Sequence, residues 1–164
     1  MKQTVTVITI IVLGLISLFF LGRGNQTTVQ SQGQGEIASV AVSEKLFDFG
    51  TISMKNGMVS HIFTITNSSD KDIDVKKIST SCMCTNAYIV SANGEKGPFG
   101  MEGHGGFVPP ANVTIKSGNS LDLKVVYDPN AHGPAGVGTI DRVVYLTDAS
   151  GGTLQLEIKA VVTP

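Results

Sequence analysis

The sequence predicts an all-β domain in which two antiparallel sheets, with seven or eight strands in total, pack face to face behind one N-terminal transmembrane helix. Apolar and polar residues alternate with a period of two along several short stretches, which is typical of strands with one buried face. Clusters of Gly, Asn, Asp, Ser and Pro separate these stretches and predict turns. Strands that are apolar on one face bury it by packing in two layers.

The first 22 residues differ in character from the rest of the chain. Residues 4–22 carry no charge over 19 positions, which is long enough to cross a hydrocarbon core of about 30 Å. A cleaved signal peptide is the alternative, but its apolar region is typically about 7–15 residues and ends in an A-x-A-like site. No alanine occurs before Ala38. We therefore expect residues 1–3 to be a short cytoplasmic tail and residues 4–22 an uncleaved signal anchor in the cell membrane, with the remainder on the extracytoplasmic side.

Residues 23–36 form a polar tract of Gln, Gly, Ser and Thr with one isolated valine. This composition cannot bury apolar area, so we expect a flexible linker. The folded domain is expected over residues 37–164, which is long enough to bury a normal core. From residue 36 onward there are ten Lys/Arg and all thirteen Asp/Glu of the chain, with both signs interspersed. This charge pattern predicts no nucleic-acid partner.

The strands expected in chain order are residues 39–50, 58–67, 72–80, 85–90, 120–129, 138–148 and 153–162. In three of them the alternation also shows which side chains face the core. These are Val59, His61, Phe63 and Ile65 in the second, Leu121, Leu123, Val125 and Tyr127 in the fifth, and Leu154, Leu156, Ile158, Ala160 and Val162 in the last. The order of the strands within the sheets does not follow from this pattern.

The succession of FDFGTI, GMVSHIFTITNSSDKDIDVKKISTSCMCT, GNSLDLKVVYDP and LQLEIKAVVTP resembles bacterial domain-of-unknown-function family 1573. That family is related to the immunoglobulin-like modules of sperm-protein-like and ciliary proteins. The resemblance covers about residues 47–164, with one insertion. Family members read Ser-Cys-Gly-Cys-Thr at the cysteines, where this chain has Met83 in place of the glycine. The resemblance implies an immunoglobulin-like module that is exported and often membrane- or lipid-anchored, and it implies no activity.

Cys82 and Cys84 are the two cysteines of the chain. In an extended strand they would point to the same face, and three interpretations stay open. Free cysteines pack as small hydrophobic residues. A disulfide between them suits an oxidising exterior, although residues i and i+2 of a flat strand lie near the upper limit of Cα separation for a bridge, about 6.8 Å. Two thiolates also suit a soft metal such as Cu(I), whereas a structural zinc site needs four ligands.

Histidine and methionine side chains elsewhere are the candidates to complete a metal site. His61 shares the apolar face of its strand, which favours a place in the core or at its rim. His132 lies in a glycine-rich turn, which favours an exposed loop position. Met101 and His104 lie in a Gly/Pro-rich insertion that begins nine residues after Cys84. An insertion folded back over the cysteines would form a copper or zinc site from Cys82, Cys84, Met101 and His104; apart from such a metal, we expect no cofactor.

The insertion, residues 93–111, holds six glycines and three of the six prolines of the chain. A structureless loop of this length is uncommon in a compact domain and is usually functional or mobile. Loops carried by a rigid scaffold commonly bind partners. An unknown protein partner is therefore expected at this loop, with contacts from Phe99, Met101, His104 and Phe107.

Enzymatic motifs are absent: the sequence has no nucleophile elbow, no His-Glu-x-x-His run and no phosphate-binding loop. We therefore expect no catalytic residues. The expected function is that of a membrane-anchored, exported scaffold or protein-interaction module that is not an enzyme. The alternative is a soft-metal-binding or thiol-redox module that uses Cys82 and Cys84.

Overall fold

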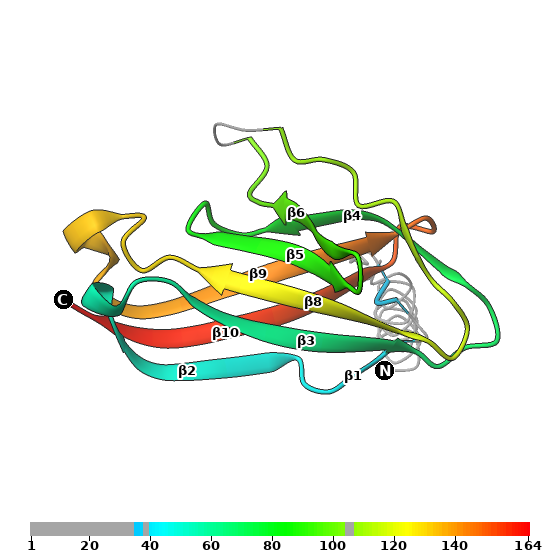
Figure 1. The fold of residues 1–164 in the computed structure, drawn as a ribbon, viewed down its shortest axis with the longest axis horizontal. Coiled ribbons are helices and arrows are strands. Elements are labelled where there is room, and N and C mark those ends of the chain that lie inside the picture. The colour runs from blue at the N-terminus through cyan, green and yellow to red at the C-terminus, as the bar shows by residue number, and fades with distance from the viewer. Residues whose placement is uncertain (1–34, 38–39, 104–106) are drawn as a thin grey trace, which may run out of the picture. The chain divides into compact units, whose positions relative to one another are not determined.

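The computed structural model describes residues 35–37, 40–103 and 107–164. In this part of the chain ten strands form two five-stranded sheets (Figure 1). The first sheet contains, in spatial order, β1 (Val40–Val42), β3 (Val59–Asn67), β8 (Ser120–Tyr127), β5 (Thr85–Ser91) and β6 (Gly94–Phe99). The second contains β2 (Leu46–Ser53), β10 (Thr153–Thr163), β9 (Gly138–Asp148), β4 (Ile73–Thr80) and β7 (Val113–Ile115). The all-β prediction is confirmed.

The strand order is that of an immunoglobulin-like sandwich. In the immunoglobulin fold, strands A, B, E and D form one sheet and strands C, F and G form the other. Here β1, β3, β8 and β5 lie in the order A-B-E-D, and β4, β9 and β10 lie in the order C-F-G. Strands β2, β6 and β7 extend the two sheets at their edges.

The structure corrects the predicted strands in two respects. The described residues contain ten strands instead of seven or eight, because the stretch 39–50 divides into β1 and β2 and because β6 and β7 were not predicted. In addition, β2 pairs with β10 in parallel, so the second sheet is mixed and not purely antiparallel. A period-two pattern shows which residues share a face but carries no information on strand direction.

The core lies between the two sheets and contains the predicted buried faces of the longest strands. Phe63, Leu123, Val125, Leu156 and Ile158 are fully buried. All nine residues predicted to face inward in β8 and β10 are buried. One continuous cluster joins side chains of both sheets, as expected for a two-layer sandwich.

His61 lies at the rim of this core, as the sequence predicts. Its ring stacks on Phe47 with the ring centroids 3.6 Å apart and meets Phe63 edge-on at 4.8 Å. Its Nε2 lies 2.8 Å from Glu44 Oε1. The partly buried imidazole is therefore held by aromatic and carboxylate neighbours, and His61 is not in the group of potential metal ligands found among the described residues.

Asn67, at the end of β3, is a fully buried polar side chain. Its Nδ2 donates to the carbonyl oxygens of Lys71 at 2.7 Å and Ile115 at 2.9 Å. Its Oδ1 accepts from the backbone N–H of Ser69 at 3.0 Å and from the Ser69 hydroxyl at 2.7 Å. This amide thus ties the turn after β3 to β7 and satisfies its own hydrogen-bonding groups.

The predicted anchor at residues 4–22 and nearly all of the predicted linker at 23–36 lie outside the described residues. Within residues 35–37, 40–103 and 107–164, we find no helix with the length and apolar character needed to cross a bilayer. Helical structure in this part of the chain consists of two 3-10 turns, η1 (Met54–Asn56) and η2 (Gly133–Gly136).

Candidate functional site: a cysteine turn at one end of the sandwich

Cys82 and Cys84 lie on the turn that connects β4 in one sheet with β5 in the other. The backbone N–H of Thr85 donates to the carbonyl of Cys82 at 3.1 Å and closes the turn. The Thr80 hydroxyl lies 3.0 Å from the Cys82 carbonyl and 2.9 Å from the Thr85 carbonyl, so it contacts the backbone on both sides of the turn. The extended geometry considered from the sequence does not hold for these two residues: β4 ends at Thr80, and the chain bends after it to pass between the sheets.

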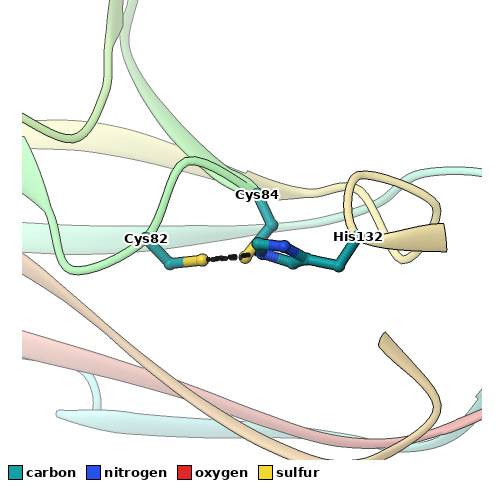
Figure 2. A group of neighbouring side chains, drawn as sticks. All are labelled: Cys82, Cys84 and His132. Atoms are coloured by element: carbon teal, nitrogen blue, oxygen red, sulfur yellow. Dashed lines mark hydrogen bonds between the residues drawn. The ribbon is translucent and has the colours of Figure 1, made fainter. Parts of the chain in front are cut away.

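The bend brings the two thiols together. Cys84 Sγ lies 2.6 Å from Cys82 Sγ, and both residues are free cysteines (Figure 2). Cys84 is 1% exposed and belongs to the core, whereas Cys82 is only partly buried. The two sulfurs are therefore in contact, but only one of them is accessible from solvent.

Two cationic or ionisable side chains from distant parts of the chain complete the cluster. His132, in the loop after β8, places Nε2 at 3.2 Å from Cys82 Sγ. Arg142, on β9, donates from Nε to Cys84 Sγ at 3.2 Å and from Nη1 to the Asp141 carbonyl at 2.8 Å. In Figure 2 the His132 ring points at the cysteine sulfurs. The donor atoms of Cys82, Cys84 and His132 all lie within 4.8 Å of one another.

Backbone hydrogen bonds fix the His132 loop against the cysteine turn. The N–H of Asp128 donates to the Cys84 carbonyl at 2.9 Å. Two further bonds, from Ala131 N–H to the Asp128 carbonyl and from Gly133 N–H to the Asn130 carbonyl, curl the loop back on itself. The approach of His132 to Cys82 thus follows from the folded backbone on either side of it.

This environment separates the two thiols chemically. Burial raises the pKa of the Cys82 thiol, but hydrogen bonds from Cys84 and His132 and the charge of Arg142 outweigh it and lower the pKa to about 7. Burial raises the pKa of the Cys84 thiol, and its hydrogen bond to Cys82 raises it further, against the opposing effect of Arg142. Cys82 is therefore the thiol that ionises first, with Cys84 as its hydrogen-bond donor.

A hollow of about 590 Å³ adjoins the accessible thiol. Its lining includes Ser81, Cys82, His132, Val137 and Arg142, and Cys84 is not part of that lining. Of the two thiols, a molecule in this hollow therefore contacts that of Cys82. The arrangement is an accessible, acidic thiol backed by a buried one, which is the pattern of reactive cysteine pairs.

The structure brings together only part of the predicted metal site. Cys82 and Cys84 are adjacent, as required, and the histidine beside them is His132, which the sequence favoured as an ordinary exposed loop residue. His104 lies outside the described residues. Met101 is partly buried just after Gly100, whose carbonyl accepts a hydrogen bond from Thr80 N–H at 3.1 Å. A role for Met101 or His104 as a ligand stays a prediction.

The predicted partner-binding insertion is also partly corrected. Residues 94–99 form β6, which pairs with β5 and is not a structureless loop. Phe99 is fully buried in the core, so it cannot contact a partner as predicted. Phe107, by contrast, is 87% exposed. The sequence pattern missed β6 because its first five residues are exposed and it contains two glycines and a proline.

His132 and Arg142 are the residues of the site that sequence reasoning missed. They stand 50 and 58 residues after the cysteines with which they interact. The one available signal was topological: in an immunoglobulin-like order, the C–D turn, the loop after strand E and strand F come close at one end.

The module resembles known proteins at the level of family and fold. Residues 40–101, which include both cysteines but neither His132 nor Arg142, match the family described as protein of unknown function (DUF1573). This match is shorter than the predicted range of about 47–164 at its C-terminal end. Among curated proteins, no significant sequence match was found.

Solved structures show a similar fold at low sequence identity. A protein of unknown function from Porphyromonas gingivalis W83 has a TM-score of 0.55 and 12% identity, covering 82% of this chain and 51% of its own. A family 123 glycoside hydrolase from Clostridium perfringens has a TM-score of 0.51 and 7% identity, covering 73% of this chain and 23% of its own. The chain thus spans about half and a quarter of their lengths, and the likeness concerns the fold alone. The family resemblance read from the sequence is confirmed over residues 40–101, where the chain matches the DUF1573 module.

Proposed function

We propose that this chain is a non-enzymatic immunoglobulin-like module on the outer side of the cell membrane whose cysteine turn exchanges two electrons with external thiols and disulfides. The observation that carries the proposal is the contact of 2.6 Å between Cys82 Sγ and Cys84 Sγ, with one thiol accessible and the other buried. A family of unknown function and a sequence without enzymatic motifs favour a stoichiometric carrier or interaction module over a catalyst.

The turn removes the geometric objection to a bridge between the two cysteines. In a flat strand, their Cα atoms would lie near the upper limit for a disulfide, about 6.8 Å. Here the chain bends between β4 and β5, and the Cys82–Thr85 hydrogen bond holds the bend. The two sulfurs meet without an additional rearrangement of the backbone.

Oxidation of the cysteine pair by an external disulfide takes two steps. The Cys82 thiolate attacks one sulfur of an external disulfide RSSR, so that a Cys82–SR bond forms, the S–S bond of RSSR breaks, and one RS⁻ leaves and takes up a proton. Cys84 loses its proton to solvent and attacks Cys82 Sγ, which forms the Cys82–Cys84 bond and expels the second RS⁻. The two cysteines together lose two electrons, and RSSR is reduced to two RSH. An excess of external dithiol reverses both steps.

The surrounding side chains suit these roles. A thiolate is the attacking species, and neighbouring cations stabilise it. Arg142 contacts Cys84, and His132 contacts Cys82. In the tautomer with its proton on Nε2, the His132 ring donates to the Cys82 sulfur. Cys82 is therefore the attacking residue and Cys84 the resolving one.

The test is a thiol count on the full-length protein after incubation with oxidised or reduced dithiothreitol. We expect both thiols to disappear and return together. Cys84→Ser should instead stop at a mixed disulfide on Cys82 when a monothiol disulfide is supplied. Persistence of two free thiols in every oxidising mixture, or loss of thiols only through covalent dimers, would overturn the proposal.

Soft-metal binding is the second candidate function, and the approach of three donor atoms within 4.8 Å favours it. Two thiolates and an imidazole suit three-coordinate Cu(I), whereas a structural zinc ion would need a fourth ligand. Titration of the reduced full-length protein with Cu(I) and Zn(II) distinguishes the cases. Stoichiometric Cu(I) binding that weakens in His132→Ala supports this second function, and uptake that is unaffected by loss of the cysteines excludes it.

The membrane anchor is part of the proposal. The uncharged run of residues 4–22 supports it, because its length matches a bilayer core. N-terminal sequencing of the mature protein from a membrane fraction is the appropriate measurement. A chain that starts at Met1 agrees with an uncleaved anchor, whereas a start near Asn25 would contradict it.

A further inference from the structure

We propose that the cysteine pair reacts with small disulfides that carry carboxylates, and that the hollow beside Cys82 holds them through Arg142. This inference rests on the proposed thiol–disulfide function and adds the class of substrate to it.

Access to the pair is one-sided. Cys84 is 1% exposed and is covered by its own turn and by Arg142, whereas Cys82 lines the hollow. A disulfide that enters the hollow therefore meets Cys82 as the attacking thiol. Whatever lines the hollow also contacts the groups attached to the disulfide sulfurs.

The size and lining of the hollow suit a small molecule. Its volume of about 590 Å³ falls within the range of about 300–1,000 Å³ that is usual for small-ligand sites. Apart from the ionisable residues, its lining consists of small and medium-sized residues: Ser81, Ala135, Gly136, Val137, Thr139 and Ile140. Ser81 and Arg142 are among its polar lining residues, and the Ser81 hydroxyl already accepts from the Val143 N–H at 2.9 Å.

The charge of the hollow favours an anion. Arg142 supplies a guanidinium, and His132 adds an imidazole. Asp141 is the acidic residue of the lining; Lys159 lies 3.5 Å from its carboxylate and 2.6 Å from that of Glu157, so this ammonium offsets the charge of Asp141 only in part. A guanidinium has five N–H groups, of which the contacts to Cys84 Sγ and the Asp141 carbonyl use two. The other N–H groups suit a carboxylate in the fork geometry that arginine offers.

The experiment compares three small disulfides of similar length and different charge: dithiodipropionate (dianionic), bis(hydroxyethyl) disulfide (neutral) and cystamine (dicationic). For each disulfide, the rate of thiol loss from the full-length protein is divided by the rate at which the same disulfide reacts with a free neutral thiol. This ratio corrects for the intrinsic reactivity of the three disulfides. We expect the normalised rate to fall in that order, with about a tenfold step between the dianion and the neutral compound, as for one charge-assisted hydrogen bond. High salt should reduce the step.

Variants assign the preference to Arg142. Arg142→Gln should lose the preference for the dianion yet still react with the neutral disulfide, and Arg142→Lys should keep part of it. Lys124→Gln, on the other sheet and paired with Glu95, makes the same charge change away from the hollow and should keep the full preference. Thermal unfolding of each variant checks that the fold is intact.

The outcomes separate this inference from the proposed function. Equal normalised rates for all three disulfides, or a preference that survives in Arg142→Gln, would overturn the inference while the thiol–disulfide function stands. Reaction with disulfide-containing proteins but with none of the small compounds would also overturn it, in favour of a protein substrate. Failure to react with any disulfide, small or protein, would overturn the proposed function itself.

Discussion

Cys82 and Cys84 are one residue apart and yet have different surroundings. Cys84 faces the core, accepts a hydrogen bond from Arg142 and donates one to Cys82. Cys82 faces solvent and His132. The lowered pKa of Cys82 and the raised pKa of Cys84 express this difference.

The rate of alkylation should reveal the acidic thiol. Because the thiolate is the nucleophile, the rate rises with pH as the thiol ionises, and for Cys82 it should be half-maximal near a pH of about 7. The measurement is the pH profile of iodoacetamide labelling, with mass spectrometry to identify the labelled residue. His132→Ala should move the midpoint upward. A midpoint near the usual value of about 8.5 in the unsubstituted protein would contradict the geometry.

The buried Asn67 amide has a structural role at the end of β3. Asn67→Leu leaves the buried Ile115 carbonyl and the part-buried N–H of Ser69 without their amide partner, whereas the Lys71 carbonyl keeps the Ser69 hydroxyl. We expect the free energy of unfolding to fall by about 2–3 kcal/mol. Urea denaturation measures it. Asn93→Ala, at an exposed turn, is the control and should change it by no more than about 0.5 kcal/mol; an equal effect of both would contradict this account.

At the scale of elements, β6 shows why an edge strand can be hidden in a sequence. Its first five residues are exposed, so they show no alternation, and its glycines suggested a loop. The structure uses Gly97 for close approach: a Cβ there would lie 2.8 Å from the carbonyl oxygen of Ala87, and its φ is +151°. The glycine is required by the pairing of β6 with β5.

Gly97→Ala should therefore lower the free energy of unfolding more than a Gly→Ala substitution at a site where the added Cβ strains the backbone dihedral but collides with nothing. Gly118→Ala is the matched control, because its φ is +73° but nothing lies within 4 Å of the added Cβ. We expect the control to cost about 1 kcal/mol, and Gly97→Ala to cost at least about 1 kcal/mol more, since the added group collides with backbone. Equal midpoints in urea denaturation would show that β6 does not pack as described.

The two phenylalanines of the predicted partner loop should behave differently. Phe99 fills the core and Phe107 is 87% exposed. Phe99→Ala is expected to lower the free energy of unfolding by about 3–5 kcal/mol, whereas Phe107→Ala should change it by no more than about 0.5 kcal/mol. Thermal and urea denaturation of both variants provide the comparison. A large loss of stability in Phe107→Ala would contradict its exposed position.

At the scale of the whole molecule, local patterns and long-range contacts differ in how far they could be predicted. The alternation in β3, β8 and β10 identified their buried faces, because side-chain burial in a sheet follows from period two. The same pattern could not reveal the parallel pairing of β2 with β10. Nor could it reveal that His132 and Arg142 meet the cysteines, since that contact depends on how strands distant in sequence are arranged.

The topology is therefore what turns two cysteines into a site. The C–D turn, the loop after β8 and strand β9 come together at one end of the sandwich, and the contacts of Asp128, His132 and Arg142 with the cysteine turn join them. Cys82 and Cys84 without these neighbours would be two small residues on a bend. With them, they form an asymmetric thiol pair next to a hollow.

The most direct test of this account is the redox state of the peptide that holds both cysteines. Trypsin cuts after Lys77 and Lys96, so both thiols fall in the peptide of residues 78–96. The full-length protein is oxidised with a small disulfide, and its remaining free thiols are alkylated. The mass of the tryptic peptide is then measured by mass spectrometry, with and without reduction and a second alkylation. We predict an unalkylated peptide lighter by two hydrogens, which takes up two alkyl groups after reduction. A peptide that is doubly alkylated before any reduction, whatever the oxidant, would contradict the account.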